Sequence, residues 1–484
     1  MRGEQFHYQE EPLLQTSHDL YTEISKILEG KRNKLTAVSD RIWDFAETRY
    51  EEVQSAEILA MTLEEEGFEV ERNAGEIETA FVASFGSGEP VIAFLGEYDA
   101  LSGLSQQADS ATKDPIEEGG NGHGCGHNLL GTGAMAAAIA VKQLMEETGL
   151  EGTVRYYGCP AEEGGGGKAF MARAGLFNDV DVALTWHPWD ENQVYHARML
   201  ATCQVYFRFT GTSSHAAFSP HLGRSALDAV ELMNIGSNFL REHIIPEGQL
   251  HYAITDAGGM SPNVVQPNAE VLYKIRAPKM GQVEDILERV KDVARGAALM
   301  TGTKLEIKFD AASADLIPNE TLGKLIHKHL EATDAPTYSE EELAFAKEVQ
   351  QTFSAEEKAV IQKNDNKVIA QGILDFPRVP GFFKGSTDVG DVSWLVPTGQ
   401  IYVTTCAYAT PFHSWQLVTQ GKTSIAHKGM LFTGKVLAAS AVELLEKPEL
   451  LEGIKAEHQA NLEGETYRSL IPSDTKPAPI KRKK

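Results

Sequence analysis

Cysteine is scarce in this sequence, which has only four in 484 residues. They are Cys125, Cys159, Cys203 and Cys406. Four widely spaced cysteines do not make a disulfide framework in a chain of this length, so we expect a reducing compartment. The sequence also has no run of about 18 apolar residues, and its first residues, MRGEQFHYQEEPLLQ, lack a basic segment followed by an apolar one. We therefore expect a cytoplasmic protein.

Basic residues are also few relative to acidic ones. The chain has 44 Lys and Arg against 69 Asp and Glu, which gives a formal net charge of -25 and a pI near 5.0. A field of this sign repels nucleic acid and anionic membranes, so we expect neither as a partner. An anionic substrate would need local positive groups. The length and the 42% hydrophobic content indicate a globular protein with two or more domains.

The order of the predicted elements indicates an α/β fold with an insertion. Helical spacing predicts two helices in 20–65, and apolar runs between glycines predict the strands that follow. A helix is expected over 129–147. Residues 199–315 are predicted as strand, helix, two strands, helix and strand, which is a split β-α-β-β-α-β unit. We therefore predict an inserted domain at 199–315 between two parts of a larger domain, 1–198 and 316–484, whose basic tail, KPAPIKRKK, we expect to be disordered.

The segment GNGHGCGHNLLGTG places His123, Cys125 and His127 at alternate positions in a glycine-rich turn ahead of a helix. One thiolate and two imidazoles at this spacing can reach a single metal ion, and the glycines let the backbone turn tightly. The alternative is a glycine-rich turn with solvated histidines and a packed cysteine.

Three predicted strands end in residues that can do chemistry. VIAFL is followed by Glu97 and Asp99, TVRYYGCP by Ala161-Glu162-Glu163 and four glycines, and a third strand ends in His187. Open α/β sheets place ligand-binding groups at such strand ends. Two adjacent carboxylates suit a divided role, in which one binds a metal and the other moves a proton. An exposed acidic loop is the alternative.

Six segments, in this order, resemble the metal-dependent amidohydrolases related to aminoacylase and glutamate carboxypeptidase, in the branch that uses a cysteine as metal ligand. They are HGCGHNLLGTG, PAEEGGGGK, TWHP, GTSSHAAFSPHLGRSALDAV, SPNVVQPNAEVLYKIRAP and FHSW. GEYDALSGLSQ, STDVGDVSW and HSWQLVTQGKTSIAHKGM narrow the resemblance to members that cleave p-aminobenzoyl-glutamate. It covers nearly the whole chain. It implies a mixed-sheet catalytic domain interrupted by a ferredoxin-like lid domain, an α+β sandwich that dimerises.

The resemblance also implies site residues. A pair of divalent metals, manganese or alternatively zinc, would be held by Cys125, His127, Glu163, His187 and His413, with Cys125 bridging. Glu162 would be the general base, and Asp99 would orient a ligand histidine. Glu97 stands where the wider family has a histidine ligand, so its role stays open. No role follows for His123, His221, Arg224 and His427.

In the inserted domain, the resemblance implies that His215 reaches across a dimer to stabilise an oxyanion, and that Asn263 and Arg276 bind the substrate near its carboxylate. A turn histidine and a surface arginine are the alternatives. The implied reaction is hydrolysis of an N-acyl amino acid amide, above all p-aminobenzoyl-glutamate. The alternatives are a related acyl-aspartate or dipeptide amidohydrolase, or a chain that needs a related sister subunit for activity. The implied dimer would form with a second copy of this chain or with that sister subunit.

Overall fold

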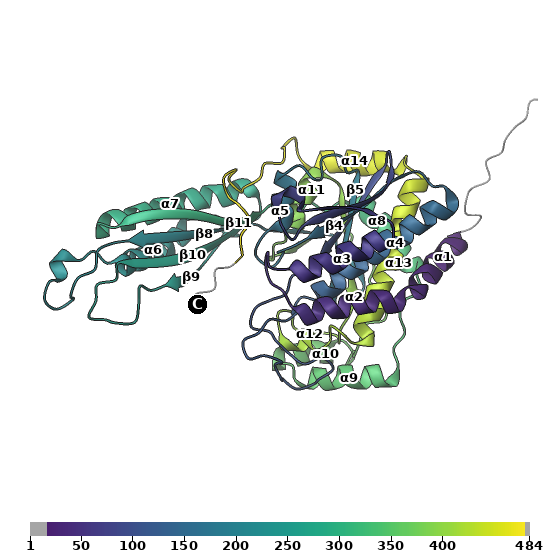
Figure 1. Cartoon of the computed structure of the whole chain (residues 1–484), viewed down its shortest axis with the longest axis horizontal. Coiled ribbons are helices and arrows are strands. Elements are labelled where there is room, and N and C mark those ends of the chain that lie inside the picture. The colour runs from purple at the N-terminus through teal and green to yellow at the C-terminus, as the bar shows by residue number, and fades with distance from the viewer. Residues whose placement is uncertain (1–16, 480–484) are drawn as a thin grey trace, which may run out of the picture.

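A computed structural model describes residues 17–479, in which a large sheet and a smaller one lie side by side (Figure 1). The large sheet has seven strands in the order β1-β2-β4-β3-β5-β13-β6, and the smaller has four in the order β11-β8-β10-β9. A short pair, β12 (Gly381–Phe383) and β7 (Ala197–Met199), lies apart from both. The mixed α/β class predicted from the sequence is confirmed. The polar amino-terminal segment up to residue 16 and the tail residues 480–484 lie outside the described residues.

Four neighbouring strands of the large sheet end at the same edge. β3 pairs in parallel with β4 and β5, and β5 pairs in parallel with β13. The seven strands are β1 (Glu69–Arg72), β2 (Phe81–Ser87), β3 (Val91–Glu97), β4 (Gly152–Cys159), β5 (Val182–Trp189), β6 (Gln193–Val194) and β13 (Thr398–Thr404). Since parallel strands bring their carboxyl ends together, the residues that follow β3, β4 and β5 become neighbours.

Helices cover one face of the large sheet and bury its largest apolar core. They are α1 (Ser17–Gly30), α2 (Arg32–Phe45), α3 (Val53–Glu65), α4 (His127–Thr148), α8 (Glu320–Ala332) and α13 (Ser424–Glu446). The prediction of two helices in 20–65 is wrong, because the chain breaks after Gly30 and again at Ala46, where φ is +44°. Apolar spacing continues through both breaks and could not reveal them.

Shorter helices complete the larger part of the molecule. They are α5 (Gly167–Arg173), α9 (Glu340–Gln351), α10 (Ala355–Lys363), α11 (Val389–Leu395), α12 (Trp415–Val418) and α14 (Leu450–Asn461). α9 and α10 begin at capping boxes in which Ser339 and Ser354 accept from the backbone of Glu342 and Glu357. No helix within residues 17–479 combines the length and apolarity that a bilayer crossing requires. A cytoplasmic location stays a prediction.

The smaller sheet belongs to the inserted unit, which we call the lid. Its elements follow the predicted order: β8 (Ala201–Thr210), α6 (Ala226–Leu240), β9 (Gln249–Asp256), β10 (Asn268–Ala277), α7 (Met280–Thr301) and β11 (Lys304–Ser313). Its strands pair antiparallel, and α6 and α7 cover one face. Along β10, Tyr273 and Ile275 are buried, whereas Lys274 and Arg276 project from the opposite face. The boundaries at 199 and 315 stay a prediction.

The chain enters the lid through β8 and leaves through β11, which pair with each other. A bulge in β11 at Asp310 interrupts this pairing, and Asp310 accepts two hydrogen bonds, of 2.9 and 3.0 Å, from the guanidinium of Arg49. Arg49 also donates to the carbonyl oxygens of Gly164 (2.8 Å) and Ala478 (3.1 Å). The tail was predicted to be disordered, but this contact places residue 478 beside the junction of the lid. One arginine therefore joins the larger part of the molecule, the lid and the carboxyl-terminal segment.

Candidate active site

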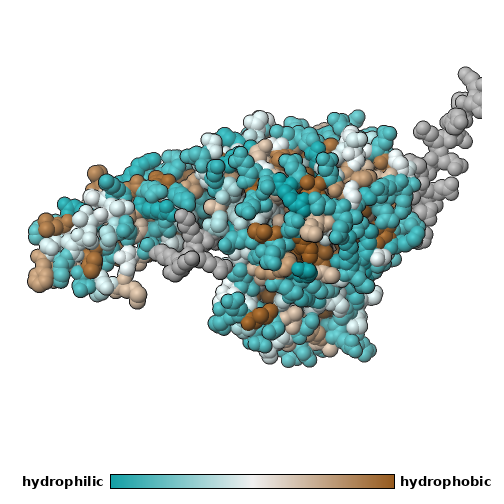
Figure 2. Space-filling view, in the orientation of Figure 1, coloured by the Kyte–Doolittle hydropathy of each residue, from teal (hydrophilic) through white to brown (hydrophobic). Residues whose placement is uncertain are grey.

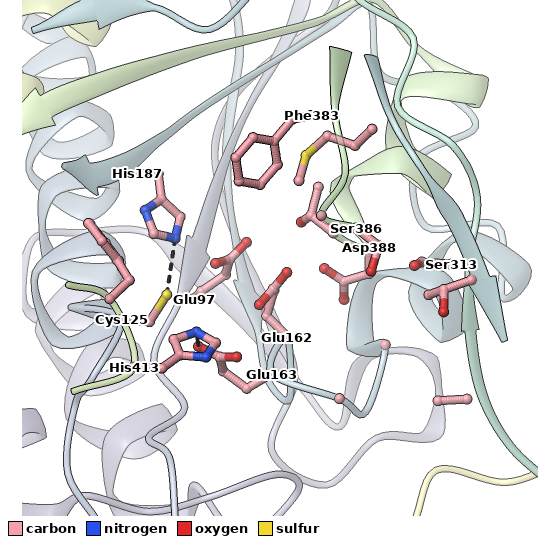
Figure 3. Close-up of a pocket in the computed structure, with 18 of the residues that line it drawn as sticks. Glu97, Cys125, Glu162, Glu163, His187, Ser313, Phe383, Ser386, Asp388 and His413 are labelled. Carbon is pink, nitrogen blue, oxygen red and sulfur yellow. Dashed lines mark hydrogen bonds and ion pairs between the residues drawn. The ribbon is translucent and has the colours of Figure 1, made fainter. Parts of the chain in front are cut away.

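A cavity of about 550 Å³ lies between the carboxyl edge of the large sheet and the open face of the lid sheet. The residues singled out from the sequence that line it are Glu97, Cys125, Glu162, Glu163, His187 and His413 (Figure 3), and Arg276 lines it from the lid. Asp99 and His127 lie behind this lining and are fully buried. Nine candidates from distant parts of the chain are thus brought together around one cavity, with Arg276 on the lid side and the others on the side of the large sheet.

Cys125 is shared by two groups of potential metal ligands. Cys125, His127 and His187 form one group, and Cys125, Glu163 and His413 form the other. Within each group the ligand atoms lie within 4.8 Å of one another. This arrangement suits two cations bridged by one thiolate, because imidazole, thiolate and carboxylate are all ligands of divalent transition metals.

Hydrogen bonds orient both histidines of the first group, the buried His127 and the half-buried His187. His187 Nδ1 donates to the carbonyl of Pro188 at 2.7 Å, which leaves Nε2 facing Cys125 Sγ at 3.4 Å. His127 Nδ1 lies 2.9 Å from Asp99 Oδ1, and the other oxygen of Asp99 accepts from the backbone N–H of Glu163. Asp99 therefore positions members of both groups, as the carboxylate behind a metal-binding histidine commonly does.

Two of the donors, His187 and Glu163, are in the protonation state that a metal requires. Burial lowers the pKa of His187 to about 4, so that its ring is neutral at pH 7. Burial opposes ionisation of Glu163, but the contacts with His413 and His127 outweigh it and lower the pKa of Glu163 to about 2.

Cys125 and His127 would release a proton when a metal binds. Burial raises the pKa of the Cys125 thiol. Burial opposes protonation of His127, but the charges of Cys125 and Asp99 outweigh it and raise the pKa of His127.

His127 Nε2 and Glu163 Oε1 are buried and make no hydrogen bond. Their polar contacts are ion pairs with Glu97 Oε2 at 3.3 Å and with His413 Nε2 at 3.2 Å. Both partners also belong to groups of potential metal ligands, so a cation could replace these contacts.

The backbone at the site is held in unusual conformations. His413 has a φ of +56° and Ala161, which precedes the two glutamates, has a φ of +61°. Strained backbone of this kind clusters at functional sites. Gly126 has a φ of +77° at the turn into α4, and a Cβ at Gly167 would lie 2.0 Å from the carbonyl of Pro160. The glycines of PAEEGGGGK therefore let the loop fold back on β4 and hold the glutamates at the cavity.

Glu162 points into the cavity beside Glu97 and Asp388 (Figure 3). Burial, together with the charges of Glu97 and Glu163, raises the pKa of Glu162 well above its usual value. Lys168 is fully buried and lies 2.7 Å from Glu97 and 2.5 Å from Asp388. Glu97 is therefore neutralised by a lysine, although it also lies near His127 Nε2, at 3.3 Å. Lys168 is the last residue of the PAEEGGGGK motif, but nothing in the sequence indicated that it pairs with Glu97 and Asp388.

Aromatic rings form a further part of the lining. Trp189 stacks on Tyr402 and on Phe412, with ring centroids 4.7 and 4.4 Å apart, and the ring of His187 lies about 6 Å from all three. Sequence reasoning missed these residues, although Trp189 and Phe412 lie next to two predicted ligands in TWHPW and PFHSW. The stack gives the cavity a flat apolar surface beside the proposed metal ligands.

The lid candidates divide into two groups. Arg276 lines the cavity and donates to Ser386 Oγ at 2.6 Å. His215 and Asn263 do not line it: they lie in neighbouring exposed loops of the lid, where Ala216 N donates to the carbonyl of Asn263. Within one chain the structure therefore brings Arg276 to the cavity and leaves the other two outside. Their roles stay predictions.

Two further histidines have structural partners. The spacing in the glycine-rich segment predicted His123 as a possible metal ligand beside Cys125 and His127, but it belongs to none of the groups of potential ligands among the described residues. His123 Nε2 donates to the carbonyl of Ile42 at 3.0 Å, and burial lowers the pKa of His123 to about 4. His427 Nε2 lies 2.8 Å from Asp40 Oδ1. Both contacts fix α2 against the segments that carry the site. His221 is exposed on the lid.

Comparisons with known proteins agree with the motifs. The model of "Peptidase family M20/M25/M40" matches residues 93–361. The chain is 50% identical over 479 residues to one of the subunits of p-aminobenzoyl-glutamate hydrolase of Escherichia coli K12, covering 96% of this chain and all of that protein. It is 31% identical over 448 residues to Xaa-Arg dipeptidase of Mus musculus, covering 89% of this chain and 90% of that protein. A dinuclear metal-binding peptidase of Bacillus subtilis shares the fold, with a TM-score of 0.53 and 18% identity over 86% of this chain and 99% of that one.

Proposed function

The chain belongs to peptidase family M20/M25/M40, and on that premise we propose that it hydrolyses the amide bond of an N-acyl amino acid, above all p-aminobenzoyl-glutamate, to p-aminobenzoate and glutamate. The observation that carries the proposal is the pair of metal-type ligand groups that share Cys125 at the floor of the cavity. No other part of residues 17–479 combines such groups with a cavity.

The proposal includes two divalent cations, held by Cys125, His127, Glu163, His187 and His413. When bound, such cations acidify water and polarise the scissile carbonyl. Thiolate, imidazole and carboxylate do not discriminate between manganese and zinc, and we take manganese first and zinc second. The buried atoms His127 Nε2 and Glu163 Oε1, whose polar contacts are ion pairs with other potential ligands rather than hydrogen bonds, support a cation at this place.

The remaining steps fall to protein side chains. Glu162 takes a proton from the attacking water and delivers it to the leaving nitrogen, and its raised pKa suits such a base. Arg276 binds the substrate carboxylate with the guanidinium donors that Ser386 leaves free. The stack of Trp189, Tyr402 and Phe412 accepts a flat acyl group such as aminobenzoyl.

We include a dimer, formed with a second copy or with a related sister subunit, since the relative in E. coli is named as one subunit of a hydrolase. Large apolar side chains are exposed on the lid, among them Phe218, Leu222, Phe239, Ile254 and Met260. Hydrophobic spots lie at the end of the lid that points away from the larger part of the molecule (Figure 2). Exposed apolar surface favours an interaction with a partner. His215 lies beside one of these side chains, with its ring centroid 4.4 Å from that of Phe218, and Asn263 is nearby. A partner seated there would lie against both residues, which supports His215 as an oxyanion donor to the partner's cavity.

The second candidate is a dipeptidase, favoured by the 31% identity to an Xaa-Arg dipeptidase. The basic groups Lys274 and Arg276 on the lid side of the cavity oppose it, because they repel a cationic side chain.

The test is hydrolysis by the purified chain alone, with manganese or zinc, of a panel of acyl-glutamates, acyl-aspartates and dipeptides ending in arginine. We expect p-aminobenzoyl-glutamate to be cleaved fastest and the chain to contain two metal ions per site. Cleavage of arginine dipeptides alone would replace the proposal with the second candidate. Activity that appears only after a related sister subunit is added would assign this chain to a two-subunit enzyme.

A further inference from the structure

Lys274 lines the cavity but has no task in the reaction proposed above. It precedes Arg276 by two residues on β10, so both side chains leave the same face of the lid sheet. Arg276 has a hydrogen-bond partner in Ser386. Among residues 17–479, no hydrogen bond or ion pair reaches the ammonium group of Lys274.

The charges around Lys274 explain why this is unusual. Burial lowers the pKa of Lys274, and the positive charges of Arg276 and Arg49 lower it further. The negative charges of Glu162 and Glu163 raise it, but by less. A largely desolvated ammonium beside a guanidinium, with no bonded counter-ion, is an unfavourable arrangement for stability alone. Groups placed in this way are found where a ligand supplies the missing partner.

We propose that Lys274 binds a carboxylate on the side chain of the substrate's amino acid while Arg276 binds its α-carboxylate. The inference rests on the proposed function and names its substrate class, N-acyl amino acids with an acidic side chain. Two residues of strand separate the attachment points by about 6.6 Å. Three carbons separate the two carboxylates of glutamate, so each can meet its own cation. A substrate with one carboxylate would leave Lys274 unpaired, and one with a basic side chain would be repelled.

The test compares p-aminobenzoyl-glutamate with p-aminobenzoyl-glutamine, which has nearly the same shape and no side-chain charge. In Lys274→Met, we expect kcat/KM for the glutamate compound to fall about tenfold to a hundredfold, mainly through KM, since a charge-assisted hydrogen bond is lost. Activity on the glutamine compound should hardly change. Lys274→Arg should keep much of the preference. The matched control is Lys304→Met, which removes an exposed charge from β11 of the same sheet.

Three results would overturn the inference. An equal fall on both substrates, with a shifted pH profile of turnover, would assign Lys274 to the environment of Glu162. No fall on either substrate would remove Lys274 from substrate binding.

If the wild-type chain cleaves no acyl amino acid, the proposed function fails, but calorimetric titration with the same two compounds still tests Lys274. We expect tighter binding of the glutamate compound, lost in Lys274→Met, and equal wild-type affinity for both would be the third contrary result.

Discussion

The two sides of the cavity carry opposite charge. The floor, built from strand ends of the large sheet, presents Glu97, Glu162 and Glu163, whereas the lid presents Lys274 and Arg276. An acidic floor with a thiolate suits cations, and a basic lid suits carboxylates. The charge of this lid face is opposite to the net charge of the chain, which is -25. On the proposed function, this difference separates the residues that would hold cations, on the floor, from the residues that would bind carboxylates, on the lid.

The largest effect is expected on the floor, in Glu162→Gln. If Glu162 moves the proton, turnover should fall about a hundredfold to ten-thousandfold, while metal content and KM stay near wild type. Steady-state kinetics with metal analysis by mass spectrometry measures all three. Glu163→Gln should lose metal as well, because Glu163 shares a ligand group with Cys125, whereas Glu162 is grouped only with Glu97 and His127. Opposite behaviour of the two variants would exchange their roles.

Cys125→Ser also tests the floor. A serine hydroxyl is a much poorer ligand than a thiolate at neutral pH, so both cations should bind more weakly. The loss should exceed that of Asp99→Asn, which disturbs only the carboxylate behind His127 and should cost about tenfold to a hundredfold in metal affinity. Competition with a chelator ranks the two variants. Unchanged metal stoichiometry in Cys125→Ser would exclude a bridging thiolate.

A change on the lid should leave the floor intact. Arg276→Ala should lower kcat/KM for acyl-glutamate about tenfold to a hundredfold, because it removes a charge-assisted hydrogen bond. Metal content should not change, and an acyl-amine without the α-carboxylate should be cleaved as well as by the wild-type chain. Equal losses on both substrates would show that Arg276 does not recognise the carboxylate.

The smallest signal is expected from mixed subunits. His215→Ala and Glu162→Gln should each be poorly active, but exchange of subunits should restore partial activity, since one cavity of the hybrid has both groups intact. Native mass spectrometry verifies the exchange. Complete exchange without recovered activity would restrict His215 to a role within its own chain.

The sequence predicted much of the floor and less of the lid side. Strands that end in Glu97, Glu162-Glu163 and His187 could be recognised singly, and parallel pairing of β3, β4 and β5 explains why they meet. Cys125 and His127 could be recognised as donors because they share one glycine-rich segment, whereas Glu163, His187 and His413 join them only through the fold.

The residues that were missed depend on contacts across the fold. Lys168 meets Asp388, 220 positions away, and nothing local indicates that the lysine is buried. Trp189 and Tyr402 stack only because β5 and β13 are neighbours in the sheet. In the sequence, Lys274 looks like any polar residue of an alternating strand. Only the structure shows that its face of the lid sheet borders the cavity. Contacts between residues so far apart in the sequence leave no signal in the periodicity or the composition of the chain.

Arg49 couples the two sides. Its guanidinium bonds to Asp310 at the lid junction and to the carbonyl of Gly164, which directly follows Glu163. A rotation of the lid would therefore pull on the backbone of a proposed metal ligand. Affinities that are linked through one element are reciprocal, so a substrate that fixes the lid should also slow the escape of metal to a chelator. In Arg49→Met, substrate should no longer slow the loss of metal to a chelator, although the cavity residues that contact the substrate are unchanged.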